Sequence, residues 1–286
     1  MADPRFSLVV ATLGREAELR PLFASLVAQG ASLEVILVDQ NQDDRLVKVV
    51  AEFAGLLPIR HVRAEVRNSS FARNAGLPHC RGAIVGFPDD DCVYPAGTLE
   101  FVAREFADPG LGVLTGPAEA PGGGLGSGRW AAARAPIGRD NAFTTIICFN
   151  LFLRRDVLAR IGGFDEALGV GAEFGACEEN DLVIRAIAAG ARALYDPALR
   201  VVHPDKRLTP AALARAFRYG AGFGYVLRKH RFPLAVLARF LLRPLGGALL
   251  SLLRGRGLDC AYYRETLRGR LYGWREGHNA VRLPRS

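Results

Sequence analysis

The sequence predicts an α/β protein with a doubly wound, mostly parallel sheet, followed by a helical C-terminal extension. Short apolar runs alternate with segments of helical periodicity up to residue 205, and a basic, leucine-rich region follows. Of the 286 residues, 50% are hydrophobic and 23% are charged, which suffices for a core in one or two globular domains. We therefore expect one domain over residues 1–205 and a second, helical region over residues 206–286.

Four short apolar runs have the composition of strands that are buried on both faces of a parallel sheet. Two segments of helical periodicity lie between them, and each is placed to cross over one face of the sheet. The predicted strands are Phe6–Thr12, Leu33–Asp39, Ile59–Val62 and Ala83–Phe87, and the predicted helices lie around Leu19–Val27 and Leu46–Phe53. Sheets of this kind bind ligands at the carboxyl ends of their strands.

Three consecutive carboxylates, Asp89, Asp90 and Asp91, directly follow the fourth predicted strand. Burial of an ionised carboxylate costs several kcal/mol unless a cation meets it, and adjacent carboxylates also repel one another. A divalent metal such as calcium, magnesium or manganese would satisfy them, because these ions favour oxygen ligands. The alternative is a solvated acidic turn in which Asp91 caps a helix around Pro95–Phe106.

Further polar residues fall at the same edge of the predicted sheet. Thr12 ends the first strand and Asp39 ends the second. Neither a G-x-x-x-x-G-K-[ST] nor a G-x-G-x-x-G phosphate motif is present, so a bound diphosphate would need a metal and side chains such as Arg73. The alternative for Arg73 is an exposed helix arginine. The glycine-rich stretch 122–128 fits neither motif and predicts a mobile loop or a plain linker.

The N-terminus lacks the basic start and apolar stretch of a signal peptide, which favours a cytoplasmic location. Five cysteines are scattered without a C-x-x-C pair. An odd count with irregular spacing favours reduced, structural thiols over a disulfide framework or a zinc site.

Seven segments between residues 5 and 205 occur in the order and at the spacing of a known family. They are Val10–Arg15, Val38–Asp39, Ala72–Gly76, Phe87–Asp91, Gly162–Glu166, Cys177–Leu182 and Val201–Pro204. In these segments the chain resembles the family 2 glycosyltransferases, with Phe87–Asp91 as the D-x-D motif. The resemblance implies the GT-A fold, which joins a Rossmann-like nucleotide-binding half to an acceptor half.

By this resemblance the chain would be an inverting, metal-dependent glycosyltransferase of the hexosyltransferase type. It would take a sugar from a nucleoside diphosphate sugar, foremost a UDP-sugar, and transfer it to a lipid-linked or saccharide hydroxyl, with bacterial surface polysaccharide assembly as the expected pathway. A divalent cation and Arg73 would stabilise the charge that grows on the leaving diphosphate. The donor residues would be Thr12, Asp39, Arg73, Asp89 and Asp90, and Asp91 and His203 would hold Mg2+ or Mn2+.

The resemblance places the catalytic base at Glu179, where the family carries an aspartate. Glutamate is one methylene longer, and a displacement of about 1 Å matters in positioned catalysis. A first helical turn favours an ionised carboxylate, which suits a base but is also an ordinary helix-start signal. Glu178 would face the acceptor, and Asp181 or Arg185 would brace the loop. Taken alone, His203 is more typical of a strand histidine that is hydrogen-bonded within the protein than of a metal ligand.

The region after residue 205 carries 17 Lys or Arg against 3 Asp or Glu, a net +14, while residues 1–205 carry −6. This charge favours an anionic partner. The run 232–253 has the length of a membrane span, but Arg239 and Arg243 interrupt it, and Pro233 and Pro244 are expected to break the helix. On an ideal helix Arg228, Arg239, Arg243 and Arg254 share one face.

These features predict an interfacial helix on an anionic membrane surface, and hence a peripheral protein on the inner face of the cytoplasmic membrane. The alternative is a helix that packs against the first domain or against a second subunit in a homodimer.

Three other functions compete with this interpretation. Nucleic-acid binding is not expected, because the basic residues are embedded among leucines without an aromatic stacking platform. A nucleotidyltransferase, such as a sugar-nucleotide pyrophosphorylase, usually carries a glycine-rich segment after its first strand, and Ala11–Arg15 is too sparse for one. A non-catalytic relative that only binds the nucleotide sugar is the third.

Overall fold

The computed structural model describes residues 3–126, 128–205, 208–210 and 212–282, which form two compact units. The first unit extends to Phe164 and resumes with residues 179–205. The second unit consists of Asp165–Glu178 and the described residues after 205. The segment Asp165–Glu178, which the sequence assigns to the first domain, therefore clusters with the C-terminal helices.

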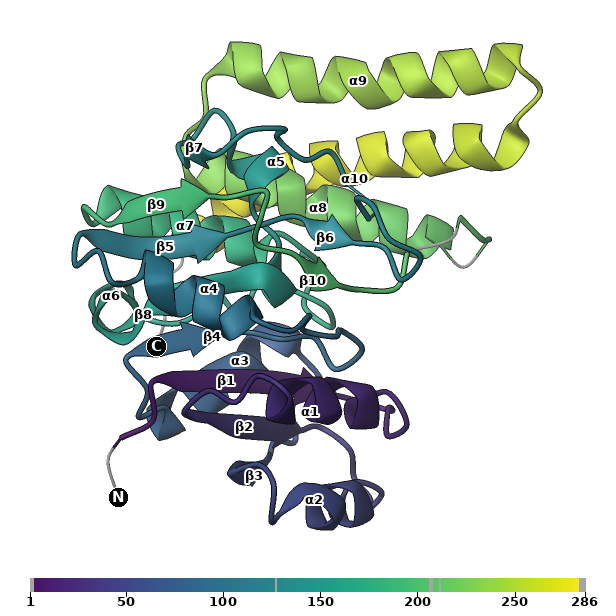
Figure 1. The fold of residues 1–286 in the computed structure, drawn as a ribbon. Helices are drawn as coiled ribbons and strands as arrows, with labels where there is room; N and C mark the ends of the chain where they lie inside the picture. The colour runs from purple at the N-terminus through teal and green to yellow at the C-terminus, as the bar shows by residue number, and fades with distance from the viewer. Residues whose placement is uncertain (1–2, 127, 206–207, 211, 283–286) are drawn as a thin grey trace. The chain divides into compact units, whose positions relative to one another are not determined.

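The first unit is built on an eight-stranded sheet with the strand order β3-β2-β1-β4-β8-β5-β9-β7 (Figure 1). The strands are β1 (Phe6–Thr12), β2 (Leu33–Asp39), β3 (Ile59–Arg63), β4 (Ile84–Gly86), β5 (Leu111–Thr115), β7 (Ala135–Pro136), β8 (Leu151–Arg154) and β9 (Arg192–Tyr195). The first four strands are parallel, as predicted, whereas β8 is antiparallel to both β4 and β5. A separate two-stranded sheet pairs β6 (Ala118–Glu119) with β10 (Val201–Val202).

The central strands are apolar because they lie in the core of this unit. β1 and β2 are buried along almost their whole length, and α1 buries Leu19, Leu22, Phe23 and Leu26 at helical spacing. The helices of the first unit are α1 (Leu19–Val27), α2 (Val47–Phe53), α3 (Ser69–Gly76), α4 (Thr98–Glu105), α5 (Ala142–Thr145), α6 (Arg155–Ile161) and α7 (Glu178–Ala188), with short 3-10 turns at Leu77–His79 and Cys148–Asn150. The predicted strand and helix alternation is confirmed.

The structure contradicts the idea that Asp91 caps the following helix. α4 begins at Thr98 and is preceded by Gly97, whose φ of 80° is left-handed. The hydroxyl and the amide of Thr98 both donate to the Pro95 carbonyl, at 2.7 and 3.1 Å, so a turn separates Asp91 from the helix.

The second unit contains three long helices, α8 (Ala212–Lys229), α9 (Leu234–Leu253) and α10 (Gly257–Arg282) (Figure 1). α8 and α10 pack backbone to backbone at glycines. A Cβ atom at Gly224 would lie 2.1 Å from the Arg270 carbonyl oxygen, and one at Gly273 would lie 1.8 Å from that of Ala221. A side chain at either position would therefore force these helices apart.

The expectation that Pro244 would break the helix is wrong, because α9 continues through it. Proline has no N–H, so the Phe240 carbonyl one turn earlier loses its helical donor. The half-buried Arg270 side chain replaces that donor: Nη1 of Arg270 donates to the Phe240 oxygen, and the guanidinium lies 4.5 Å from the ring centroid of Phe223. Burial lowers the pKa of Arg270 below its ordinary value. Arg228 also departs from the predicted arginine face, since it belongs to α8 and lies over Trp274.

A buried ion pair fastens the segment Asp165–Glu178 within the second unit. The Asp165 carboxylate is 2% exposed and accepts hydrogen bonds from Lys229 Nζ at 2.7 Å and from the Tyr225 hydroxyl at 2.9 Å. Phe174 also stacks on Tyr225, with 4.4 Å between ring centroids. Burial raises the pKa of Asp165, but the Lys229 ammonium and the hydrogen bonds outweigh it, so the pKa lies below its ordinary value of 3.8.

We expect Asp165→Asn to lower the free energy of unfolding of the second unit by about 3 kcal/mol at pH 7, because it leaves the Lys229 ammonium without its carboxylate. A carboxyl group whose pKa is lower in the folded state stabilises that state at pH values above its unfolded-state pKa. This stabilisation is lost as the pH falls through the folded-state pKa. The difference between wild type and variant should therefore be constant from about pH 5 to 8 and shrink below about pH 4. Urea unfolding across this range measures it.

The matched control is Asp156→Asn, which removes an exposed partner of Arg160 and should cost less than about 1 kcal/mol. Equal losses in the two variants would contradict a structural role for the Asp165 pair.

Candidate functional site

The three consecutive carboxylates lie beside the end of β1. Ala11 and Asp89 form an isolated parallel bridge, which continues the pairing of β1 and β4 past the end of β4. The Thr12 hydroxyl consequently donates to Asp90 Oδ2 at 2.7 Å. Thr12 and Asp90 are both buried, so the sequence prediction that they meet at one edge of the sheet is confirmed.

Two arginines neutralise the cluster. Arg73 Nη2, on α3, donates to Asp89 Oδ1 at 3.1 Å, and Arg15 Nη1 lies 2.8 Å from Asp90 Oδ1 and also pairs with Asp91. The sequence analysis did not assign a role to Arg15. Its position in the loop directly after β1 is the signal that would have found it, since that loop meets the end of β4 in such a sheet.

Arg73 is a buried residue rather than the exposed helix arginine considered as its alternative. Its side chain is 6% exposed, and its guanidinium lies 5.5 Å from the ring centroid of Phe164. α3 is fixed at its start by Asn68, whose side chain accepts from the backbone amides of Ser70 and Phe71. The helix therefore holds Arg73 in place against Asp89.

His203 joins the cluster from the residue after β10. Its Nε2 lies 3.2 Å from Asp91 Oδ1 and 3.8 Å from Asp89 Oδ2, and its ring stacks on Phe149 with 4.4 Å between centroids. Nδ1 lies 2.8 Å from the Pro204 carbonyl oxygen. A carbonyl only accepts, so Nδ1 carries the hydrogen and Nε2 is the nitrogen that faces the carboxylates.

The surroundings shift the pKa values of the neighbouring residues Asp90 and Asp91 in opposite directions. Burial raises the pKa of Asp90 to about 6, since desolvation and the charges of Asp89 and Asp91 outweigh Thr12 and Arg15. Burial also tends to raise the pKa of Asp91, but His203 and Arg15 outweigh this effect and hold that pKa at about 2. Burial lowers the pKa of His203, but its hydrogen bond to Asp91 and the charges of both acids raise it above 6.5 overall.

Asp89, Asp91 and His203 can offer one ligand atom each, and these three atoms all lie within 4.8 Å of one another. Two carboxylates and an imidazole are a donor set that suits Mn2+, whereas Mg2+ would be held chiefly by the carboxylate oxygens. The Nδ1 hydrogen bond to Pro204 orients the ring with Nε2 inward, which is the usual arrangement of a metal-bound histidine. The residues present therefore fit a divalent ion.

Asp39 lies at the end of β2, where it is in register with Thr12 on β1 and Arg63 on β3. Its carboxylate is 0% exposed, and it accepts from the Asn41 amide and side chain at 2.9 and 2.8 Å. His61 Nε2 and Arg63 Nη1 approach its other oxygen at 2.9 and 3.0 Å. His61 and Arg63 were not predicted, although their spacing of two residues on one strand places them on the same face as each other.

α7 carries a second group of predicted residues. Glu178 is buried and Glu179 is half-buried in its first turn. Asp181 is buried and accepts from Arg185 Nε at 2.8 Å. Arg185 also donates to the carbonyls of Ile161 and Gly163, each at 2.7 Å, and so ties α7 to the chain that follows α6.

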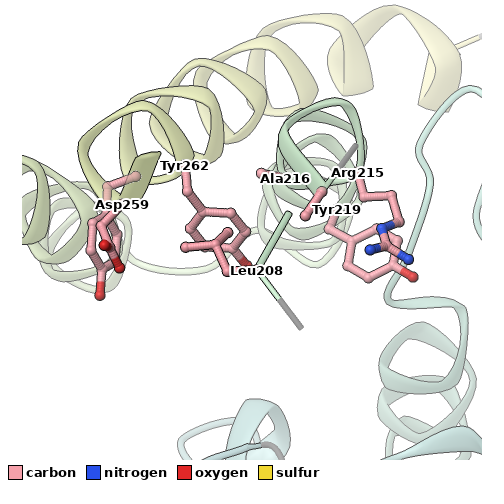
Figure 2. A pocket seen from close by; sticks show the side chains of 8 residues that line it. Leu208, Arg215, Ala216, Tyr219, Asp259 and Tyr262 are labelled. Atoms are coloured by element: carbon pink, nitrogen blue, oxygen red, sulfur yellow. The ribbon is translucent and has the colours of Figure 1, made fainter. Parts of the chain in front are cut away.

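The second unit contains a cleft of about 210 Å³ between α8 and the beginning of α10 (Figure 2). Its lining combines aromatic and charged side chains with small apolar ones. The lining residues are Leu208, Ala212, Arg215, Ala216, Tyr219, Asp259, Tyr262 and Tyr263. The sequence analysis did not anticipate this cleft.

Two solved structures that share the fold of this chain contain a nucleotide sugar. The mannosyltransferase PcManGT from Pyrobaculum calidifontis, in complex with GDP-Man and Mn2+, aligns with a TM-score of 0.65 and 18% identity over 95% of this chain and 88% of that one. S. aureus TarS 1–349, in complex with UDP-GlcNAc, aligns with a TM-score of 0.60 and 15% identity over 94% and 92% of the two chains. The chain therefore has a GT-A type fold.

A family model described as glycosyl transferase family 2 matches residues 7–162, so the chain belongs to the family 2 glycosyltransferases. It is 27% identical over 264 residues to the pre-mycofactocin glycosyltransferase of Mycobacterium tuberculosis, a match that covers 86% of this chain and 51% of the relative. It is 28% identical over 149 residues to the glycosyltransferase AglE of Haloferax volcanii, which covers 49% of this chain and 48% of the relative. The chain therefore spans about half the length of these curated relatives.

Proposed function

We propose that this chain is an inverting, metal-dependent glycosyltransferase that moves a sugar from a nucleoside diphosphate sugar to a hydroxyl group. The convergence of Asp89, Asp91 and His203 at the carboxyl end of the parallel strands is the observation that carries the proposal. Asp91 and His203, with Asp89 beside them, would hold Mg2+ or Mn2+. The ion would supply positive charge for the departing diphosphate.

The protein side chains would perform the remaining steps. Thr12, Asp39, Asp89 and Asp90 line the ends of β1, β2 and β4 and would position the nucleoside, while Arg73 would neutralise the leaving diphosphate. Glu179 would accept the proton of the acceptor hydroxyl as that oxygen attacks the anomeric carbon from the face opposite the diphosphate. Glu178 would contact the acceptor, and the Asp181–Arg185 pair would keep the start of α7 in place.

The direct test is incubation of the full chain with Mn2+ and radiolabelled nucleotide sugars, without an acceptor. UDP-sugars come first, followed by GDP-mannose. Slow release of free sugar with formation of nucleoside diphosphate supports the transferase. Pyrophosphate exchange would instead identify a nucleotidyltransferase, and binding without any turnover would identify a non-catalytic relative.

We also propose that the second unit binds the cytoplasmic surface of an anionic membrane. By length and composition α9 is able to cross a membrane, with a mean hydropathy of 1.6 and 11% of that window buried. Its exposed apolar residues are Leu234, Leu242, Leu245, Leu249, Leu250, Leu252 and Leu253. Arg239 and Arg243 are exposed on the same helix, which favours placement in the headgroup region with leucines in the acyl boundary. A lipid-linked acceptor, as in bacterial surface polysaccharide assembly, would lie at that surface.

We expect the full chain to sediment with vesicles that contain anionic phospholipid, and to be released by high salt. Combined replacement of Leu249 and Leu252 by Gln should weaken vesicle binding about tenfold or more, because two buried leucines are lost from the bilayer contact. Leu125→Gln, at an exposed leucine of the first unit, is the matched control. If the double variant instead dissociates a dimer and leaves vesicle binding intact, α9 is a subunit interface.

A further inference from the structure

We propose that Arg15 is a built-in counterion that lies beside the place of the divalent ion, so that the charges of the ion and of the Arg15 guanidinium oppose each other at Asp91. This inference rests on the proposed metal dependence. It assigns Arg15 a positioning role at the site rather than a chemical step, and it predicts that removal of this arginine strengthens metal binding.

The geometry of Asp91 carries the first part of the argument. Its Oδ1 faces His203 Nε2 at 3.2 Å, while its Oδ2 faces Arg15 Nη1. The same Arg15 nitrogen lies 2.8 Å from Asp90 Oδ1, so one guanidinium bridges two carboxylates of the triplet. A divalent ion between Asp91 and His203 would lie close to this guanidinium, and like charges at that range repel strongly. Both cannot be held by Asp91 at once without that repulsion.

The two arginines of the cluster differ in how firmly they are held. Arg73 is 6% exposed and is packed against Phe164, so it is fixed. Arg15 is 40% exposed and extends from the loop between β1 and α1, so its side chain has an open path into solvent. Gly14, with a φ of 75°, turns this loop, and its amide donates to Asn41 Oδ1 at 2.7 Å. The backbone is thereby anchored while the guanidinium remains able to turn away.

The charges of the neighbouring groups explain why such a counterion is useful. Asp89, Asp90 and Asp91 are adjacent in the chain, and Arg73 pairs with Asp89. His203 lies beside Asp91, but without a cation beside Asp90 the repulsion from Asp89 and Asp91 would destabilise the loop after β4. Arg15 supplies that cation, and an incoming ion that supplies more charge would replace it.

Mn2+ titration of the nucleotide-free full chain, followed by electron paramagnetic resonance of free Mn2+, tests the inference. We expect Arg15→Gln to bind Mn2+ about fivefold to tenfold more tightly than wild type, a coupling of ordinary size. Arg15→Lys keeps the charge and should stay within about twofold of wild type. Circular dichroism with EDTA present shows whether each variant is folded.

Arg20→Gln is the matched control, because Arg20 is a similarly exposed arginine that pairs with Glu52 outside the cluster. It removes the same charge and should leave Mn2+ affinity unchanged. Equal or weaker Mn2+ binding by Arg15→Gln would overturn the inference, as would the absence of Mn2+ binding in every variant. The proposed metal dependence is judged separately, by whether EDTA reduces UDP binding to the wild-type chain.

Discussion

Asp91→Asn should weaken the Mn2+-dependent binding of UDP by about 100-fold. Asp91 lies between His203 and Arg15, and these two groups hold its pKa at about 2, so at neutral pH its carboxylate is ionised. The amide keeps the shape of the side chain but removes the charge that a divalent ion requires. Calorimetric titration with UDP, with Mn2+ and with EDTA, measures the loss.

Two comparisons make this result specific. Asp108→Asn removes an exposed carboxylate that pairs with Arg192, and it should leave UDP binding unchanged. In EDTA the Asp91 variant should bind UDP no worse than wild type, because the metal contribution is then absent from both. Undiminished Mn2+-dependent binding by Asp91→Asn would show that this carboxylate is not a metal ligand.

Glu179→Gln should lower the rate of sugar transfer by about 10²-fold to 10⁴-fold while leaving nucleotide-sugar affinity unchanged, since an amide cannot accept the acceptor proton. Glu179 lies half-buried in the first turn of α7, where the helix N-terminus attracts a negative charge. Single-turnover transfer measures the chemical step, and titration with the same donor measures binding. Retained transfer would remove Glu179 from the mechanism.

The competing view treats Glu179 as an ordinary helix-start acid. Glu100 offers a direct control, because it is an exposed acid in the first turn of α4. If only helix stability were at stake, Glu100→Gln and Glu179→Gln should have similar, small effects of less than about 1 kcal/mol on unfolding and none on transfer. Glu179→Asp restores the residue type of the family motif, and should retain part of the activity.

Strand and helix periodicity predicted much of the first unit correctly. β1 and β2 have the predicted bounds, and Thr12 and Asp90 meet as the rule for strand ends requires. The sequence patterns that predict these elements are local, because a buried strand or a helix face is specified by residues close together in the chain. Arg15 and His61 were missed because their roles depend on partners that are 75 and 22 residues away in the chain.

The C-terminal helices show the same limit. Pro244 was expected to end a helix, and locally that expectation is sound. The Arg270 guanidinium replaces the missing donor from another helix, 30 residues further along the chain from the carbonyl that it contacts. No rule based on neighbouring residues includes that contact.

The amino-acid order alone determined the class of fold, the family, and the acidic triplet at the end of β4, since each depends on short-range patterns. The family resemblance had already paired His203 with Asp91, and the structure supplied their distance. Only the tertiary structure decided that Arg73 is buried against Asp89 and that Arg15 bridges two of the acids. The physical reason is that charged groups are paired across space, where burial and repulsion act through distance and not through position in the chain.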